Sequence, residues 1–272
     1  MQLSLLLLTA FLVLLLNPDN EISQWRGPAR DGIYPETGLL KKWPAEGPTL
    51  KLKIETIGKG LSQPVVYKNV IYLTDLKSDT LDVISACDMD GKLLWSYNTI
   101  QFHTKNGNGK GEAANTPLFY NGDIFITYGN EQPAMLFHIS DDGESISLKW
   151  KNDVLDTHHG GLVLLNGAIY GSTMLDNTRG NWASVDWETG KTNWEKEWFT
   201  KGSVISADGM LYFYEEKGGH VALVKPDTSD LKIISTFQVK GGEGPHWAHP
   251  SIYNKKLLIR HGSVLLVYDI GD

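Results

Sequence analysis

Histidine and tryptophan side chains gather at a few points of this 272-residue sequence, and their types and spacing suit ligand binding. The candidate ligand-binding residues are Asp156, His158, His159, His246, Trp247, His249, Arg260 and His261. Neutral imidazole binds divalent metals, a nearby carboxylate can orient a ring, and an indole offers a large flat surface. Three interpretations stay open for the histidines: hydrogen bonding that locks neighbouring elements together, contact with a small molecule or glycan, and a metal.

Signatures of catalysis are missing from the same sequence. It contains no HExxH metal motif and no G-x-S-x-G elbow in Ser-His-Asp order, and no pair of carboxylates stands out as acid and base. We therefore assign no catalytic residue and no metal ligand.

The elements that position these residues are short strands joined by tight turns. Residues Trp182–Trp194 read as strand, glycine turn and strand, and two apolar strands joined at Asn166-Gly167 precede them. The turn-plus-aromatic element recurs at intervals of about 45 residues, at Tyr67–Tyr72, Tyr120–Phe125, Leu165–Tyr170, Ala207–Tyr212 and Tyr253–Leu258. This spacing predicts an all-β fold, a β-propeller of four-stranded antiparallel blades with about five repeats.

The repeat register places the histidines. Twelve residues before each closing position stand Gly60, Ala113, His158, Thr200 and His246. Equivalent positions of a propeller lie on one ring, so His158 and His246 are expected to face a shared space at the channel mouth.

Three segments divide the chain. Residues 1–22, with the apolar run Leu3–Leu16, predict an export signal or N-terminal anchor. Residues 23–48 form a lead-in arm that Trp25 and Trp43 are expected to fix to the propeller. Residues 49–272 form the propeller domain, and the lone strand Leu50–Glu55 is expected to complete the last blade, since Ser251–Ile270 has room for only three strands.

Within the arm, Arg26, Arg30 and Asp31 are interpreted as a solvated loop with local ion pairs rather than as a site. Trp95, Trp150 and Trp194 are expected to wedge between blades, with Phe237 at the equivalent place in the fourth unit. Trp182, Trp187 and Trp198 suggest an aromatic ladder for sugars, although strand alternation sends half of such a set into the core.

Composition narrows the class of protein. The formal net charge of −7 argues against a general nucleic-acid surface. The one cysteine, Cys87, excludes an intramolecular disulfide framework and sits in an apolar strand pattern typical of a core residue. The N-terminal run predicts export to the periplasm or cell surface, with a retained segment giving peripheral membrane association as the alternative.

Two stretches resemble the repeats of pyrroloquinoline-quinone-type (PQQ-type) β-propeller proteins, whose signature is A-x-D-x-x-x-G-K-x-x-W. Ser184–Trp194 matches it with one substitution, and Ala86–Trp95 matches it with one residue deleted in the turn. The strings DTHHGG (Asp156–Gly161), GPHWAHP (Gly244–Pro250) and IRHG (Ile259–Gly262) also look like exported members of this superfamily.

The resemblance implies a propeller fold and two kinds of function. Some members are assembly scaffolds, which favours a non-catalytic protein that binds a protein partner, a small molecule or a glycan. Others are alcohol or sugar dehydrogenases that use PQQ with calcium, often beside a disulfide between adjacent cysteines. This chain cannot form that disulfide, so the dehydrogenase is the alternative and a carbohydrate-binding accessory protein is the second alternative.

Overall fold

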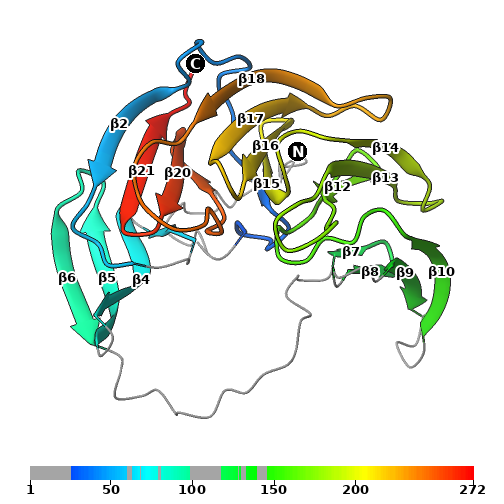
Figure 1. The fold of residues 1–272 in the computed structure, drawn as a ribbon, viewed down its shortest axis with the longest axis horizontal. Coiled ribbons are helices and arrows are strands. Elements are labelled where there is room, and N and C mark those ends of the chain that lie inside the picture. Colours follow the sequence, from blue (N-terminus) through cyan, green and yellow to red (C-terminus); the bar gives the residue numbers. More distant parts are fainter. Residues whose placement is uncertain are drawn as a thin grey trace, which may run out of the picture.

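The computed structural model describes residues 26–59, 63–67, 69–78, 81–98, 118–127, 129, 133–139 and 146–272. The predicted export segment, Trp25 and the register positions Gly60 and Ala113 lie outside this set. No helix among the described residues is long and apolar enough to cross a membrane. The described chain instead folds into five β-sheets, which follow one another in an arc (Figure 1).

Three of the sheets are built entirely from strands that are consecutive in the chain. The first sheet contains β3 (Val65–Tyr67), β4 (Val70–Ser78), β5 (Leu81–Asp88) and β6 (Leu93–Asn98). The second contains β7 (Leu118–Tyr120), β8 (Asp123–Ile126), β9 (Ala134–Ile139) and β10 (Ile146–Asn152). The third contains β11 (Val163–Leu165), β12 (Ala168–Ser172), β13 (Trp182–Asp186) and β14 (Thr192–Lys196).

The last two sheets each recruit a strand from the N-terminal part of the chain. The fourth sheet contains β15 (Gly202–Ala207), β16 (Met210–Glu215), β17 (His220–Lys225), β18 (Lys232–Gln238) and the added β1 (Ile33–Tyr34). The fifth contains β19 (Ser251–Tyr253), β20 (Lys256–His261), β21 (Val264–Asp269) and the added β2 (Thr49–Ile54).

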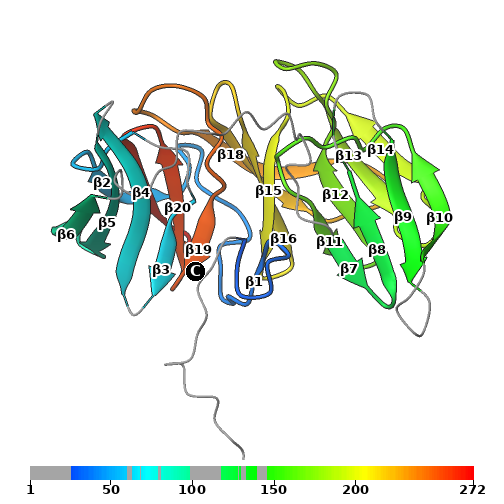
Figure 2. The same cartoon turned by 90° about the horizontal axis from the view of Figure 1, so that it is seen from below.

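Pairing of β2 with β21 confirms that an early strand completes the last sheet. The two strands run antiparallel, with Ile54 opposite Leu265 and Thr49 opposite Asp269. The fourth sheet differs from the expected four antiparallel strands, because β1 adds a fifth. It runs parallel to β15, with Ile33 opposite Ser206, and lies beside it in Figure 2. The lead-in arm therefore contributes backbone hydrogen bonds to a sheet, which its Gly- and Pro-rich sequence did not indicate.

Neighbouring sheets pack face to face, in the order second, third, fourth, fifth, first. We call the face of a sheet that points to the next one in this order its front, and the opposite face its rear. Phe125 on the front of the second sheet shares a buried cluster with Val185 on the rear of the third. Equivalent apolar clusters join the third sheet to the fourth, the fourth to the fifth, and the fifth to the first. Burial of these faces, at about 25 cal/mol per Å² of apolar surface, stabilises the arc.

One cross-strand row of residues, which ends on an aromatic side chain in the last strand, recurs on the front faces of several sheets. In the third sheet Tyr170 stands opposite Ser184, and Ser184 opposite Trp194. Trp194 is buried there, and its indole N–H donates a 2.8 Å hydrogen bond to the Asp227 carbonyl, in the connection between β17 and β18 of the next sheet. Trp150 of the second sheet likewise donates to the Trp187 carbonyl at 2.9 Å. These two tryptophans act as the inter-sheet wedges expected from the sequence.

The other two assignments to this row were wrong. Trp95 occupies the same register in the first sheet, opposite Ala86, but 48% of it is exposed because no described sheet covers that front. In the fourth sheet the register position belongs to Ser235, and Phe237 lies two residues further on, where it still packs between the fourth and fifth sheets against Tyr268. The backbone N–H of Trp43 donates to the Ser235 hydroxyl, and its ring packs against Phe237, so the arm supplies the missing aromatic.

Turn glycines follow the sequence prediction where the backbone requires them. Gly167 and Gly190 adopt φ values of 77° and 70°, in the left-handed region that favours glycine. A Cβ atom on Gly190 would also lie 2.4 Å from the ring of Trp150. This turn therefore needs glycine both for its backbone angle and for the packing of the second sheet on the third.

Trp182 tests the packing between the third and fourth sheets. Its ring is fully buried and stacks on Phe213 with centroids 4.0 Å apart. Trp182→Ala is expected to lower the free energy of unfolding by about 3–5 kcal/mol, as measured by urea denaturation. Leu175→Ala, at an exposed loop side chain, is the control and should change it by less than about 0.5 kcal/mol. Equal losses in the two variants would contradict the packing scheme.

Candidate functional site

The predicted histidines lie in connections at one edge of the sheets. His158 and His159 belong to the connection between β10 and β11, while His246, Trp247 and His249 belong to the one between β18 and β19. The two connections meet: the ring centroids of His159 and Trp247 are 5.4 Å apart. His158 lies 3.0 Å from His159, measured between their Nδ1 atoms. The structure thus brings together residues almost ninety positions apart. The residues in contact are His159 and Trp247, each one position after the register pair His158 and His246, whereas the His246 ring stacks on His261.

Trp247 is the accessible member of this group, with 43% of its surface exposed. His158 and His159 are half-buried beside it. We call these three residues the Trp247 face. An indole with an imidazole at its side offers a flat apolar surface with a polar edge, which suits recognition of a partner side chain or a ring.

A buried ion pair lies behind this face, and no pattern in the sequence indicates it. The Lys201 Nζ atom is 3.2 Å from Glu216 Oε1, and Glu216 Oε2 is 3.3 Å from His159 Nε2. Lys201 and Glu216 are both buried. Lys201 directly precedes β15 and Glu216 directly follows β16. The surrounding strings KGS and EEKGG resemble ordinary turn sequences. The pair fixes the edge of the His159 ring from behind.

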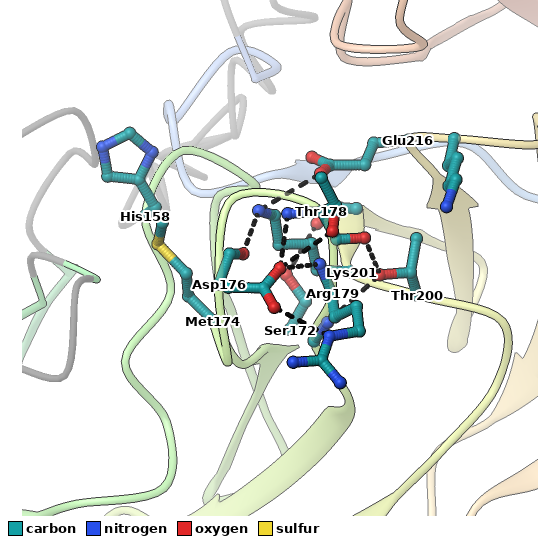
Figure 3. A network of polar contacts seen from close by, with 12 residues as sticks. His158, Ser172, Met174, Asp176, Thr178, Arg179, Thr200, Lys201 and Glu216 are labelled. Carbon is teal, nitrogen blue, oxygen red and sulfur yellow. Dashed lines mark hydrogen bonds and ion pairs between the residues drawn. The ribbon is translucent and has the colours of Figure 1, made fainter.

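The connection between β12 and β13 completes this network (Figure 3). Lys201 Nζ donates a 2.9 Å hydrogen bond to the Asp176 carbonyl. The Asp176 carboxylate accepts bonds from the backbone and hydroxyl of Thr178 and pairs with Arg179. Backbone hydrogen bonding from Thr178, together with Arg179, holds the pKa of Asp176 well below its usual range. The loop is thereby locked with its carbonyl toward Lys201, and His158 lies beside Met174 at the edge of the network.

His246 and His261 form a second group. Their rings stack with centroids 3.6 Å apart, and Tyr214 lies within hydrogen-bonding distance of His246 Nδ1. Burial, then the charge of His261, lowers the pKa of His246 to about 4, so this ring is neutral near pH 7. Burial raises the pKa of Tyr214, so its hydroxyl stays protonated and donates to His246.

His249 is buried against Arg26, and its contacts define its tautomer. Its Nδ1 atom lies 3.3 Å from Arg26 Nη1 and accepts from it, so Nε2 carries the proton and donates to the His159 carbonyl at 2.9 Å. Burial, then the positive charge of Arg26, lowers the pKa of His249 to about 3. This histidine is a neutral link between the arm and the Trp247 face.

Arg26 itself corrects the interpretation of its segment as a solvated loop. Its side chain is buried, with φ at 64°, and donates to the carbonyls of Val204, Leu162 and Asp31. Its backbone N–H donates to the Gln63 side chain. Burial lowers the pKa of Arg26 to about 10, so the guanidinium remains charged at neutral pH. The short sequence WRGPARDG carries no apolar pattern that would signal this burial.

Arg260 and Asp156 occupy structural positions. Arg260 is completely buried and donates to the carbonyls of Gly262 and Gly58, which ties the end of β2 to the fifth sheet. Asp156 is buried and accepts a 2.6 Å bond from the Met174 backbone N–H. Neither residue lies on the Trp247 face.

The described residues do not fit a calcium ion with a quinone. Calcium takes six to eight oxygen ligands. Of the nearby carboxylates, Glu216 pairs with Lys201, Glu215 caps the turn that leads to His220, and Asp156 bonds to the backbone. No group of three or more His, Cys, Asp or Glu side chains in the described part of the chain is placed to hold a metal. We derive no reaction step through a cofactor.

The opposite edge of the sheets carries two open cavities. One, of about 500 Å³, lies between the third and fourth sheets, where Lys41 pairs with Asp208. The other, of about 590 Å³, lies between the fifth and first sheets and is lined by Asn69, Met89 and Lys256 among others. Both are at the hairpin turns, at the other end of the strands from the Trp247 face.

Comparisons with known proteins give remote similarities. No protein-family model and no curated protein sequence matches the chain. BamB from Moraxella catarrhalis is 16% identical, with a TM-score of 0.44 over 79% of this chain and 61% of that one. A europium-containing methanol dehydrogenase is 14% identical, with a TM-score of 0.38 over 90% and 56%. The WD40 domain of Toxoplasma gondii coronin is 10% identical, with a TM-score of 0.39 over 75% and 64%.

The chain thus spans less than two thirds of each of these structures. At these TM-scores the similarities carry no argument about activity, and the fold rests on the sheet pairing described above.

Arg26→Ala tests the role of the buried guanidinium. Several backbone carbonyls and His249 would lose their donor, so the free energy of unfolding should fall by about 3–5 kcal/mol in urea denaturation. Arg26→Lys should recover only part of the loss, since one ammonium cannot replace the planar fork. Lys191→Ala, at an exposed lysine, is the control. Full recovery by lysine would contradict the role assigned to the fork.

His249→Gln tests the buried neutral imidazole. The pKa of His249 is about 3 in the folded protein against 6.5 as the ordinary value, so the unfolded chain binds more protons below pH 6.5. Its contribution is complete above pH 6.5 and declines as the pH falls toward 3, by up to about 1.4 kcal/mol per pH unit. Glutamine can make both hydrogen bonds without titrating. The variant should therefore lose stability less steeply between pH 6.5 and 5, and identical slopes would refute the assignment.

Proposed function

We propose that this protein is an exported, non-catalytic binding scaffold that receives a protein partner on the Trp247 face. The observation that carries the proposal is the exposed indole of Trp247, fixed beside His159 over a buried ion pair. Tryptophan is enriched among the residues that dominate binding energy at protein interfaces. The proposed export rests on the N-terminal apolar run Leu3–Leu16.

The hydrogen bonds and ion pairs that the acid and base groups already make support binding rather than catalysis. Glu216 is paired with Lys201, and His249 uses both ring nitrogens for Arg26 and the His159 carbonyl. His246 is stacked and accepts from Tyr214. A general base must reach the proton that it abstracts, and these groups are committed to holding the loops.

A protein partner suits this face better than a glycan. The suggested ladder for sugars needs several accessible rings, but Trp182 and Trp187 are completely buried in the core. Trp247 is then a single anchor, which fits one apolar contact in a wider interface. Carbohydrate binding and PQQ-dependent oxidation remain the competing proposals, and each has its own assay.

Photo-crosslinking tests the proposal. A benzoylphenylalanine at position 247, in the full chain expressed in its native host, is expected to trap a defined protein partner, identified by mass spectrometry. The control is the same substitution at Tyr120, an exposed aromatic at the opposite edge of the sheets. His159→Ala should weaken the position-247 crosslink about tenfold by releasing the support of the indole.

Other outcomes would replace the proposal. Saturable quinone absorbance with dye reduction, after addition of PQQ and calcium, would establish an oxidoreductase. Glycan-array binding that Trp247→Ala abolishes would establish a carbohydrate-binding protein. Identical crosslinks from positions 247 and 120 would show that the Trp247 face does not select a partner.

A further inference from the structure

The front of the first sheet is a packing surface that the chain itself leaves uncovered. Tyr72, Ala86 and Trp95 stand opposite one another across β4, β5 and β6. This is the register that Tyr170, Ser184 and Trp194 occupy in the third sheet. Trp194 is 6% exposed under the fourth sheet, whereas Trp95 is 48% exposed. The residues are those of an inter-sheet wedge, but nothing in the described chain receives it.

The rear of the second sheet is uncovered in the complementary way. Phe137 stands opposite Leu148 there, on the face away from Phe125 and the third sheet. Leu148 is 47% exposed, and Phe137 and Met135 are half-buried. In the third sheet the position equivalent to Phe137 is Val185, which is completely buried beneath the second sheet.

These two surfaces lie at the ends of the arc. In both views β4–β6 and β8–β10 occupy opposite ends of the molecule (Figures 1 and 2). The four apolar clusters join the front of every sheet except the first to the rear of the sheet that follows it. Within the described residues, no such cluster joins the first sheet to the second. One front and one rear of the same construction are therefore left over, and exposed aromatic and aliphatic patches of this kind mark interaction sites.

We propose that the front of the first sheet packs on the rear of the second sheet of another copy of this chain. The occupant is a second copy because each uncovered face would pack on a sheet of this same repeat. The matching face lies at the other end of the same molecule. A two-fold axis lets both contacts form at once, so the pair closes without an uncovered end. The indole N–H of Trp95 would donate to a carbonyl of the partner sheet, as Trp150 and Trp194 do within one chain.

Sedimentation velocity of the full chain in a non-ionic detergent tests this pairing. The wild-type chain is expected to sediment with the mass of two copies, with the single-copy mass appearing on dilution. Trp95→Glu and Leu148→Glu should each raise the dissociation constant about 100-fold or more, by placing a charge in an apolar contact. Leu175→Glu, at a loop leucine that is 53% exposed, is the matched control and should leave the pairing unchanged.

Mixing the two variants separates the proposal from its rivals. Trp95→Glu keeps an intact second sheet and Leu148→Glu an intact first sheet, so an equimolar mixture should regain a two-copy species through one contact. Dissociation by Trp95→Glu but not by Leu148→Glu would overturn the proposal in favour of two first sheets meeting. A wild-type chain that stays single at every concentration would also overturn it. Far-ultraviolet circular dichroism checks that each variant is folded, and Trp95→Gln replaces Trp95→Glu if that variant is not.

Discussion

A buried positive charge sets the geometry of this protein. The guanidinium of Arg26 donates to carbonyls at the starts of the third and fourth sheets and to His249, just before the fifth. Its backbone N–H reaches Gln63, just before the first. A buried charge is tolerated only when its donors are satisfied, so these connections must keep their positions. Gly161 is needed beside it, because a Cβ atom there would lie 1.8 Å from Arg26.

The histidine-rich edge follows from that constraint. With Arg26 charged, His249 is favoured as a neutral ring, and its proton is directed to the carbonyl of His159. His159 is then fixed from one side by this bond and from the other by Glu216, which presents Trp247 in a defined orientation. Rigid aromatic anchors lose little conformational entropy on binding. In the proposed binding role, the charges behind the face would favour recognition by holding Trp247 in one orientation before the partner arrives.

Local sequence patterns predicted the strands and turns of this molecule but not the buried contacts of Arg26 at its centre. The sheets and their register follow from sequence patterns that depend on local geometry. These patterns are turn glycines such as Gly190, the alternation around Tyr170, and the strand Thr49–Ile54, which has no partner next to it in the sequence. Arg26 has no such pattern, since its burial depends on carbonyls more than a hundred residues away. The exposure of Trp95 was missed for a similar reason: a wedge motif specifies a ring, but only the arrangement of whole sheets decides whether a neighbour covers it.

Pairing of β2 with β21 also governs when the fold can be completed during synthesis. The N-terminal strand β2 leaves the ribosome long before β21 is made, so the fifth sheet stays incomplete until β21 has been synthesised. Such a long-range pairing carries a loop-closure cost and slows folding. If the chain is exported as proposed, this late pairing would also keep the fifth sheet incomplete while the chain enters a translocation channel.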